Sequence, residues 1–344
     1  MQPVALSEPA RIQTISDIAR LAGVSKSTVS RALNDSPLIG RETKDRIRLI
    51  AQEHRFALNE PARRLSRGQS NVAGLVMFGN PGGHYTPDMF MLELMGGIST
   101  GLLEEGYELL VVQPFAADED FARRYVDSGR ADGFVVLSAS CTPRRLELLV
   151  ESGVPFVVWG RHAQHGEFSS VSGDNFGGGR LAAQHLISTG RRRIAFVGGP
   201  EWAPEAVERR RGYESALTEA GIDLDPALVV PTPWHDPERY AGEAVGRLLD
   251  DGVKLDGIVT NSDRYAIGAI DALRSRSLDV PGDVAVVGYD DGAMAQFTVP
   301  ALTTIRQDGP LAGRLIARAL VQHVQTGAVS NVAMPAELVV RESA

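Results

Sequence analysis

A short stretch near the N-terminus carries hydrogen-bond donors along one face of a helix. Lys26, Ser27, Ser30, Arg31 and Asn34 are spaced so that one side of a helix presents all five, and none of them is acidic. Base edges in the major groove and phosphates offer mostly acceptors to a protein. The pattern therefore predicts a helix that lies in the major groove of double-stranded DNA.

Two further helices are needed to hold this recognition helix. Thr14 or Ser16 can cap a first helix that has an apolar face. Gly23 can adopt a positive φ and turn the chain sharply into the second helix, which Ser25 caps. A third helix is expected from Glu42 to about Arg55. The alternative to a DNA-binding helix-turn-helix is a generic three-helix bundle.

Charge separates this block from the rest of the chain. The 344 residues carry a net charge of −8, which taken alone argues against nucleic acid as a partner. Residues 11–68 nevertheless hold twelve Arg and Lys against six Asp and Glu, whereas residues 69–344 carry −13. Such asymmetry is typical of a nucleic-acid-binding appendage. A solvated, charged helical region is the other interpretation.

From Asn71 onward, short β-branched runs alternate with longer helical stretches, which favours βαβ units and largely parallel sheets. The expected strands are 72–78, 108–113, 133–137, 155–159, 194–197, 257–260 and 284–288. Two stacked α/β lobes with a cleft between them fit this length better than one sheet. The segment 59–70, rich in Arg, Ser and Gly, is interpreted as a linker.

Other kinds of chemistry find little support. The glycine cluster from Gly173 to Gly179 lacks the G-x-G-x-x-G spacing and a Walker lysine. His162 and His165 have no matching ligands for a metal, and Cys141 is the single cysteine. No run approaches the roughly 20 apolar residues of a membrane helix, and no secretory signal is evident. We therefore expect a cytoplasmic protein that is not an enzyme and has no metal, cofactor or membrane contact.

The N-terminal block resembles the headpiece of the LacI/GalR family of bacterial transcription regulators. The matching residues are Thr14-Ile15-x-Asp17-Ile18-Ala19, Ala22-Gly23-Val24-Ser25, Thr28-Val29-Ser30-Arg31-Ala32-Leu33-Asn34, Thr43, Arg46-Ile47 and Asn59. One departure is Gly40, which stands where the family usually has Ser before the third helix, and glycine is an acceptable though weaker helix start.

The resemblance implies an α/β protein in three parts. An N-terminal three-helix helix-turn-helix headpiece at 12–58 and a hinge helix and linker at 59–70 precede a two-lobed, periplasmic-binding-protein-like domain at 71–344, which binds effector and dimerises. The N-lobe is expected at about 71–161 plus 307–326, and the C-lobe at about 162–306 plus 327–342.

By the same resemblance, the DNA contacts come from the headpiece and the hinge, with Lys26 and Ser27 in the base-reading positions. The implied DNA-binding residues are Thr14, Ile15, Ser16, Ser25, Lys26, Ser27, Thr28, Ser30, Arg31, Asn34, Asn59, Ala62, Arg63 and Leu65. In the family, the leucine that matches Leu65 is wedged into the minor groove beside its mate from a second subunit. Because a helix of about eight residues is marginal in water, the hinge is expected to fold on DNA. A flexible tether is the alternative.

The resemblance continues through the large domain and implies an effector in the interlobe cleft. The matching motifs include Asp174-Asn175, Arg209-x-x-Gly212-Tyr213, Val286 to Asp291 and Leu302 to Gln307. Open α/β sheets bind ligands beyond the carboxyl ends of their strands. The implied effector-binding residues are Arg161, Arg209, Trp234, Ser262, Asp263 and Asp290, and Asn80, His84 and Tyr85 are further candidates for the lining.

Three of these residues suit a sugar. Arg209 and Asp290 can form bidentate hydrogen bonds with vicinal hydroxyls, and Trp234 can stack on a sugar ring. The alternatives are a solvated helix face for Arg209, a turn role for Asp290 and packing under a loop for Trp234. Gly160 stands where many relatives have Asp, which transfers the donor role to Arg161, and Ser262 stands where several have Asn.

The sequence therefore predicts a homodimeric regulator that binds a double-stranded DNA operator under the control of a small molecule. A repressor of a carbohydrate-utilisation operon with a sugar effector is the preferred interpretation, and a purine or nucleoside effector is the alternative. A periplasmic-type sugar-binding protein would need a signal peptide and no basic headpiece. An enzyme would need a catalytic constellation that the sequence does not show.

Overall fold

The computed structural model describes residues 14–33, 35–54, 56, 69–77, 89–115, 118–138, 141–160 and 168–344. The chain divides into two compact units, residues 1–69 and 70–344.

The described part of the first unit is a three-helix domain. Helices α1 (Ile15–Ala22), α2 (Lys26–Leu33) and α3 (Arg41–Glu53) enclose a small core. Thr14 rather than Ser16 caps α1, where it forms a reciprocal capping box with Asp17. Gly23 ends α1 with φ +63°, as its position predicts. Gly40 precedes α3 without a side-chain hydrogen bond to the helix.

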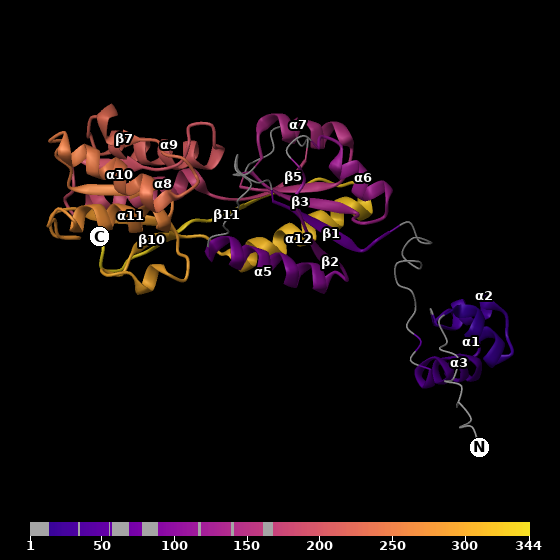
Figure 1. Cartoon of the computed structure of the whole chain (residues 1–344). Coiled ribbons are helices and arrows are strands. Elements are labelled where there is room, and N and C mark those ends of the chain that lie inside the picture. The colour runs from indigo at the N-terminus through magenta and orange to yellow at the C-terminus, as the bar shows by residue number, and fades with distance from the viewer. Residues whose placement is uncertain are drawn as a thin grey trace, which may run out of the picture. The chain divides into compact units, whose positions relative to one another are not determined.

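The second unit contains two six-stranded sheets (Figure 1). The first sheet has the order β11-β5-β4-β3-β1-β2, and all of its ladders are parallel. Its strands are β1 (Val72–Val76), β2 (Glu108–Val112), β3 (Gly133–Leu137), β4 (Phe156–Trp159), β5 (Ser169–Gly173) and β11 (Asn331–Met334). Helices α5 (Met89–Glu104) and α12 (Gly309–Thr326) cover one face, and α6 (Phe121–Asp127) and α7 (Pro143–Ser152) cover the other.

The second sheet has the order β12-β10-β9-β8-β6-β7, and β12 is its antiparallel strand. Its strands are β6 (Ile194–Val197), β7 (Val229–Val230), β8 (Gly257–Thr260), β9 (Ala285–Asp290), β10 (Thr303–Arg306) and β12 (Glu337–Val339). Helices α8 (Asn175–Ser188) and α9 (Pro204–Glu219) pack on one face, and α10 (Pro237–Asp250) and α11 (Asp263–Arg274) pack on the other. Short 3₁₀ turns lie at Pro226–Leu228 and Ala295–Phe297.

All seven predicted strands are present, but the predicted edges of the two lobes are wrong. Residues 169–173 and 331–334 fall within the ranges expected for the C-lobe, but they form β5 and β11, two strands of the first sheet that were not predicted. They pair with each other in parallel, and the Ser170 hydroxyl donates to Asn331 Oδ1 at 2.7 Å. The chain therefore passes between the sheets at three places: after β5, after β10 and between β11 and β12.

Helices α8 and α9 approach each other closely because glycines lie at their contact. A Cβ on Gly179 would lie 2.0 Å from the Arg209 carbonyl oxygen, and a Cβ on Gly212 would lie 2.0 Å from the Phe176 carbonyl oxygen. Part of the glycine cluster at Gly173 to Gly179 thus serves helix packing. This packing places Arg209 at the second sheet.

Among the helices of the described residues, none is both long and apolar enough to cross a membrane.

The close helix pair gives a stability prediction. Gly212→Ala should lower the free energy of unfolding by about 1–3 kcal/mol, because the added methyl group meets a backbone carbonyl that cannot rotate away. Gly96→Ala is the matched control, since Gly96 lies within α5 and a Cβ there would meet nothing within 4 Å. The control should be neutral or stabilising by up to about 1 kcal/mol, because alanine favours helix. Urea unfolding of the whole chain measures both, and equal effects would contradict the packing interpretation.

Candidate functional site

The outer face of α2 presents the predicted DNA contacts. Lys26, Ser27 and Arg31 are exposed, whereas Val29 and Ala32 of the same helix are buried in the core. Before the helix, the exposed Ser25 hydroxyl lies 2.8 Å from both the Ser27 and the Thr28 hydroxyls and accepts from the Thr28 amide. Thr28 and Ser30 are half-buried at the edge of this face. The structure therefore brings Ser25, Lys26, Ser27, Thr28, Ser30 and Arg31 together on α2 and its N-terminus.

The predicted DNA-binding residues at the start of α1 form contacts within the headpiece. The Thr14 hydroxyl donates to Asp17 Oδ2 at 2.8 Å, so capping engages it. Ile15 packs on the headpiece core, and Ser16 is half-buried. Contacts from these residues to DNA remain predictions.

Ion pairs decide which headpiece cations keep their charge available for phosphates. Asp35 holds Lys44 at 2.9 Å and Arg48 at 2.8 Å. The hydrogen bond and charge of Lys44, followed by those of Arg48, lower the pKa of Asp35. Lys26 and Arg31 form no ion pair within the described part of the chain. The same holds for Arg41 and Arg46 of α3, so the described residues leave positive charge available to a polyanion on α2 and on α3.

Five predicted DNA-binding residues, Asn34, Asn59, Ala62, Arg63 and Leu65, lie outside the described residues. They stay predictions.

In the second unit, Arg209 is a buried cation near the carboxyl ends of β8 and β9. Its side chain is held from α8, because Nε donates to Asn175 Oδ1 at 2.9 Å. Nη1 donates to the Asn261 carbonyl at 2.5 Å, and the guanidinium lies 3.6 Å above the centre of the Tyr289 ring. Arg209 is 6% exposed, so it does not form the solvated helix face that was the alternative.

Asp290, at the end of β9, lies beside Arg209. The two side chains approach to 3.9 Å between Nη1 and Oδ1, which is an ion pair too long to be a hydrogen bond. The Asp290 carboxylate also accepts from Gln307 Nε2 at 2.7 Å. Its backbone has φ +110°, which is uncommon for a residue with a side chain and is typical of functional sites. The structure thus brings together the predicted pair Arg209 and Asp290.

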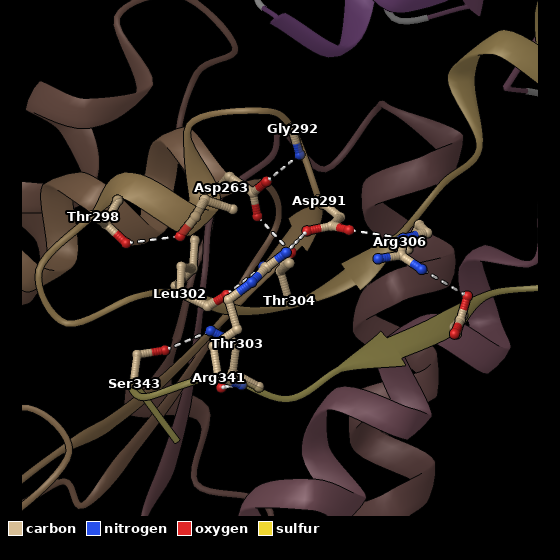
Figure 2. A network of polar contacts seen from close by, with 12 residues as sticks. Asp263, Asp291, Gly292, Thr298, Leu302, Thr303, Thr304, Arg306, Arg341 and Ser343 are labelled. Carbon is tan, nitrogen blue, oxygen red and sulfur yellow. Dashed lines mark hydrogen bonds and ion pairs between the residues drawn. The ribbon is translucent and has the colours of Figure 1, made fainter.

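Asp263 lies close by but directs its carboxylate into the protein. Thr304 donates to Oδ1 at 2.5 Å, and the Gly292 amide donates to Oδ2 at 2.8 Å (Figure 2). Burial raises the pKa of Asp263 to about 7, although both hydrogen bonds oppose this change. The described contacts of Asp263 are therefore those of a structural residue that fixes the turn after β9.

Trp234 and Ser262 are the remaining predicted residues that the structure describes. The Trp234 ring packs against the core beneath α10 and α11, with its centre 6.3 Å from that of Tyr265. These contacts favour packing over stacking on a ligand. Ser262 is buried and precedes α11 without capping it through its side chain.

Asn261, which follows β8 directly, was not among the predicted residues. Its carbonyl accepts from Arg209, while its side chain is fully buried and neither Nδ2 nor Oδ1 has a hydrogen-bond partner among the described residues. A buried amide without partners is costly and marks a candidate ligand-binding position. Its place directly after a buried strand was the one signal in the sequence.

The first sheet contributes a glycine to the same region. Gly160 follows β4 with φ +97°, and a Cβ there would lie 2.3 Å from Glu205 Oε1 and 2.8 Å from the Ser138 hydroxyl. Glu205 comes from the first turn of α9, so its carboxylate takes the room that a side chain at position 160 would need. Arg161, Asn80, His84 and Tyr85 lie outside the described residues and stay predictions. Within the described ranges, no cluster of His, Cys, Asp and Glu could hold a metal ion.

Each of the two units matches a known protein family. Residues 14–59 match the family described as bacterial regulatory proteins, lacI family, and residues 183–344 match a periplasmic binding protein-like domain. The chain is 34% identical over 342 residues to the transcriptional regulator CelR of Thermobifida fusca, covering 98% of this chain and 99% of the relative. It is 30% identical to the ribose operon repressor of Escherichia coli K12, with coverages of 90% and 93%.

Solved structures agree with these matches. A complex of the regulator CelR with cellobiose aligns with a TM-score of 0.73 at 31% identity, covering 97% of this chain and all of that one. A lac repressor dimer bound to operator and the anti-inducer ONPF aligns with a TM-score of 0.83 at 25% identity, with coverages of 96% and 98%. The predicted fold class, a helix-turn-helix headpiece followed by a two-lobed domain, is confirmed.

The free charges on α2 give a prediction about salt dependence. Arg31→Ala should weaken DNA binding and reduce the slope of log affinity against log salt by about 0.9, the value for one phosphate contact. Arg20→Ala removes the same charge from α1, where Asp17 pairs with it at 3.3 Å, and should change the slope much less. Titrations of duplex DNA at several salt concentrations measure both slopes. Equal losses would show that α2 is not the DNA-contacting face.

The raised pKa of Asp263 gives a prediction about pH. Because the folded protein holds this proton more tightly than the unfolded chain does, stability from this group falls as pH rises from about 4 to about 7 and is level above that. Asp263→Asn should therefore become more stable relative to the wild type between pH 5 and pH 8. Asp271→Asn, at an exposed position of α11, controls for the lost charge. Urea unfolding at each pH measures the difference, and the opposite trend would exclude a raised pKa.

Proposed function

The chain belongs to the LacI family of bacterial DNA-binding transcriptional regulators, and from this membership we propose that it represses a carbohydrate-utilisation operon under the control of a sugar. The observation that carries the sugar assignment is the ion pair of the buried Arg209 with the partly buried Asp290 at the strand ends of the second sheet. The similar regulator CelR was solved with cellobiose, which supports the same class of ligand.

The geometry of the pair suits a hydroxyl group. With 3.9 Å between Nη1 and Oδ1, a hydroxyl oxygen at about 2.8 Å from each atom can accept from the guanidinium and donate to the carboxylate. The two opposite charges largely compensate each other, so a neutral ligand brings no unpaired charge into the site. A polyhydroxylated, uncharged molecule meets both conditions.

A purine effector finds less support from Tyr289 and Trp234. The Arg209 guanidinium covers one face of the Tyr289 ring, and Trp234 packs against Tyr265 and the neighbouring core. Stacking on a nucleobase needs an aromatic face that the protein itself does not cover. These contacts favour hydrogen bonding to hydroxyls as the basis of recognition.

The proposal includes a homodimer on a pseudopalindromic operator. Large apolar side chains are exposed on neighbouring elements of the first sheet: Met89, Leu92 and Leu103 of α5, Val111 of β2 and Leu311 of α12. Burying such a surface in a two-fold contact would place two headpieces on two half-sites. The similarity to a lac repressor dimer bound to operator supports this arrangement.

Control of the operator then follows from linkage. If the effector and DNA favour different arrangements of the lobes, the effector changes the affinity for DNA by the same factor by which DNA changes the affinity for the effector. A coupling of about 1–3 kcal/mol corresponds to a 5–150-fold change in operator affinity.

The test is a screen of operator affinity in the presence of small molecules. An operator selected from random duplex DNA is titrated with the whole protein, with and without cellobiose, ribose, other neutral sugars, guanine and hypoxanthine. We expect a neutral sugar to change the operator affinity about 5–150-fold. Arg209→Ala should abolish this response, whereas Arg211→Ala, an exposed arginine of the same helix, should keep it. A response to a purine and to none of the sugars would refute the sugar assignment.

A further inference from the structure

The three crossings between the sheets are connected to one another. The first follows β5 at Gly173, the second follows β10 at Gln307, and the third lies between Met334 and Glu337. The first and third are joined directly, because the Asp174 amide donates to the Met334 carbonyl at 2.8 Å. Any change in the arrangement of the lobes must pass through these backbone segments.

Gln307 connects the second crossing to the candidate effector site. The residue is 8% exposed, and its Nε2 donates to Asp290 Oδ1 at 2.7 Å. Its backbone amide donates to the Asp290 carbonyl at 3.2 Å. The other end of its amide lies against the first crossing, since a Cβ on Gly173 would be 2.4 Å from Gln307 Oε1. One side chain therefore reaches from the acid of the ligand site to two of the three crossings.

The residue after Asp290 is anchored firmly. Arg306 donates to Asp291 Oδ2 at 2.8 Å, and Arg341 donates to Asp291 Oδ1 at 2.5 Å (Figure 2). Arg306 also pairs with Glu337 at the third crossing, at 3.2 Å. Because two arginines fix Asp291, the turn that holds both acids is difficult to move. A ligand that binds Asp290 can more readily displace the hydrogen bond between Asp290 and Gln307.

We propose that Gln307 is the positioning residue that couples effector binding at Asp290 to the crossings between the lobes. An effector hydroxyl that donates to Asp290 Oδ1 competes with Gln307 Nε2 for the same oxygen. The released amide rearranges against Gly173, and the favoured arrangement of the lobes changes with it. The inference rests on the proposed function in one respect: it takes Asp290 to be a contact of the effector.

A first experiment needs no ligand. Hydrogen exchange of the whole protein is compared for the wild type, Gln307→Leu and Gln325→Leu, which makes the same change at an exposed position of α12. We expect backbone amides at 173–175, 334, 336 and 337 to exchange at least about fivefold faster in Gln307→Leu than in the other two, because local opening becomes easier. Unchanged exchange at these crossings would overturn the proposal, whatever the effector is.

A second experiment measures coupling with cellobiose as the probe. In the wild type, the ratio of operator affinities without and with saturating cellobiose should lie in the 5–150-fold range. In Gln307→Leu this ratio should fall below about twofold while the Kd for cellobiose changes less than about fivefold. Gln325→Leu should match the wild type. A Gln307→Leu protein that melts earlier but keeps its ratio would show a merely structural role and overturn the proposal.

The two experiments separate this inference from the proposed function. If the wild type responds to a purine instead of a sugar, the sugar assignment fails, and the exchange experiment still decides the role of Gln307. If a sugar acts on the wild type and on Gln307→Leu alike, the sugar assignment stands and the coupling role is refuted.

Discussion

The arrangement of the second sheet depends on keeping one buried charge partnered. An isolated guanidinium in a protein interior is strongly unfavourable, so Arg209 persists only because several elements meet it. Asn175 comes from α8, the Asn261 carbonyl from the end of β8, and Tyr289 and Asp290 from β9. The glycine contacts between α8 and α9 allow this approach. Ligand binding at such a point acts on all these elements together.

Ion pairing among exposed groups also determines which cations of the first unit remain available to a partner. The positive excess of residues 11–68 is a property of the sequence, but the pairing of those charges is a property of the fold. Asp35, at the turn between α2 and α3, accepts from two cations of α3. Lys26 and Arg31 of α2 are left for a partner, as are Arg41 and Arg46 of α3. Long-range repulsion between an acidic body and DNA adds to this local selection, because it disfavours contact through the larger unit.

Strands that have a clear local pattern could be predicted from the sequence. Strands and lobe boundaries that depend on pairing between distant segments could not. The seven expected strands are apolar or β-branched runs, and all of them form. Strand β5 was missed because its sequence, Ser-Ser-Val-Ser-Gly, has no apolar alternation, although it is buried between β4 and β11. Because β5 pairs with β11 in the first sheet, the observed boundaries of the lobes differ from the predicted ones. Within the site, family motifs led to Arg209 and Asp290. Gln307 lies in a family motif as well, but its role and that of Asn261 follow only from their burial and partners.

The paired acids at the end of β9 show why residue type alone does not assign a role. Asp290 and Asp291 are adjacent and identical in chemistry, and both have positive φ. Asp291 is clamped by Arg306 and Arg341, while Asp290 faces Arg209 at a distance longer than a hydrogen bond and shares an oxygen with the amide of Gln307. A carboxylate held by two guanidinium groups loses two oppositely charged partners when it is disturbed, whereas the Gln307 amide donates one hydrogen bond and carries no charge. The anchored acid therefore fixes the turn, and its neighbour is left able to exchange partners with a ligand.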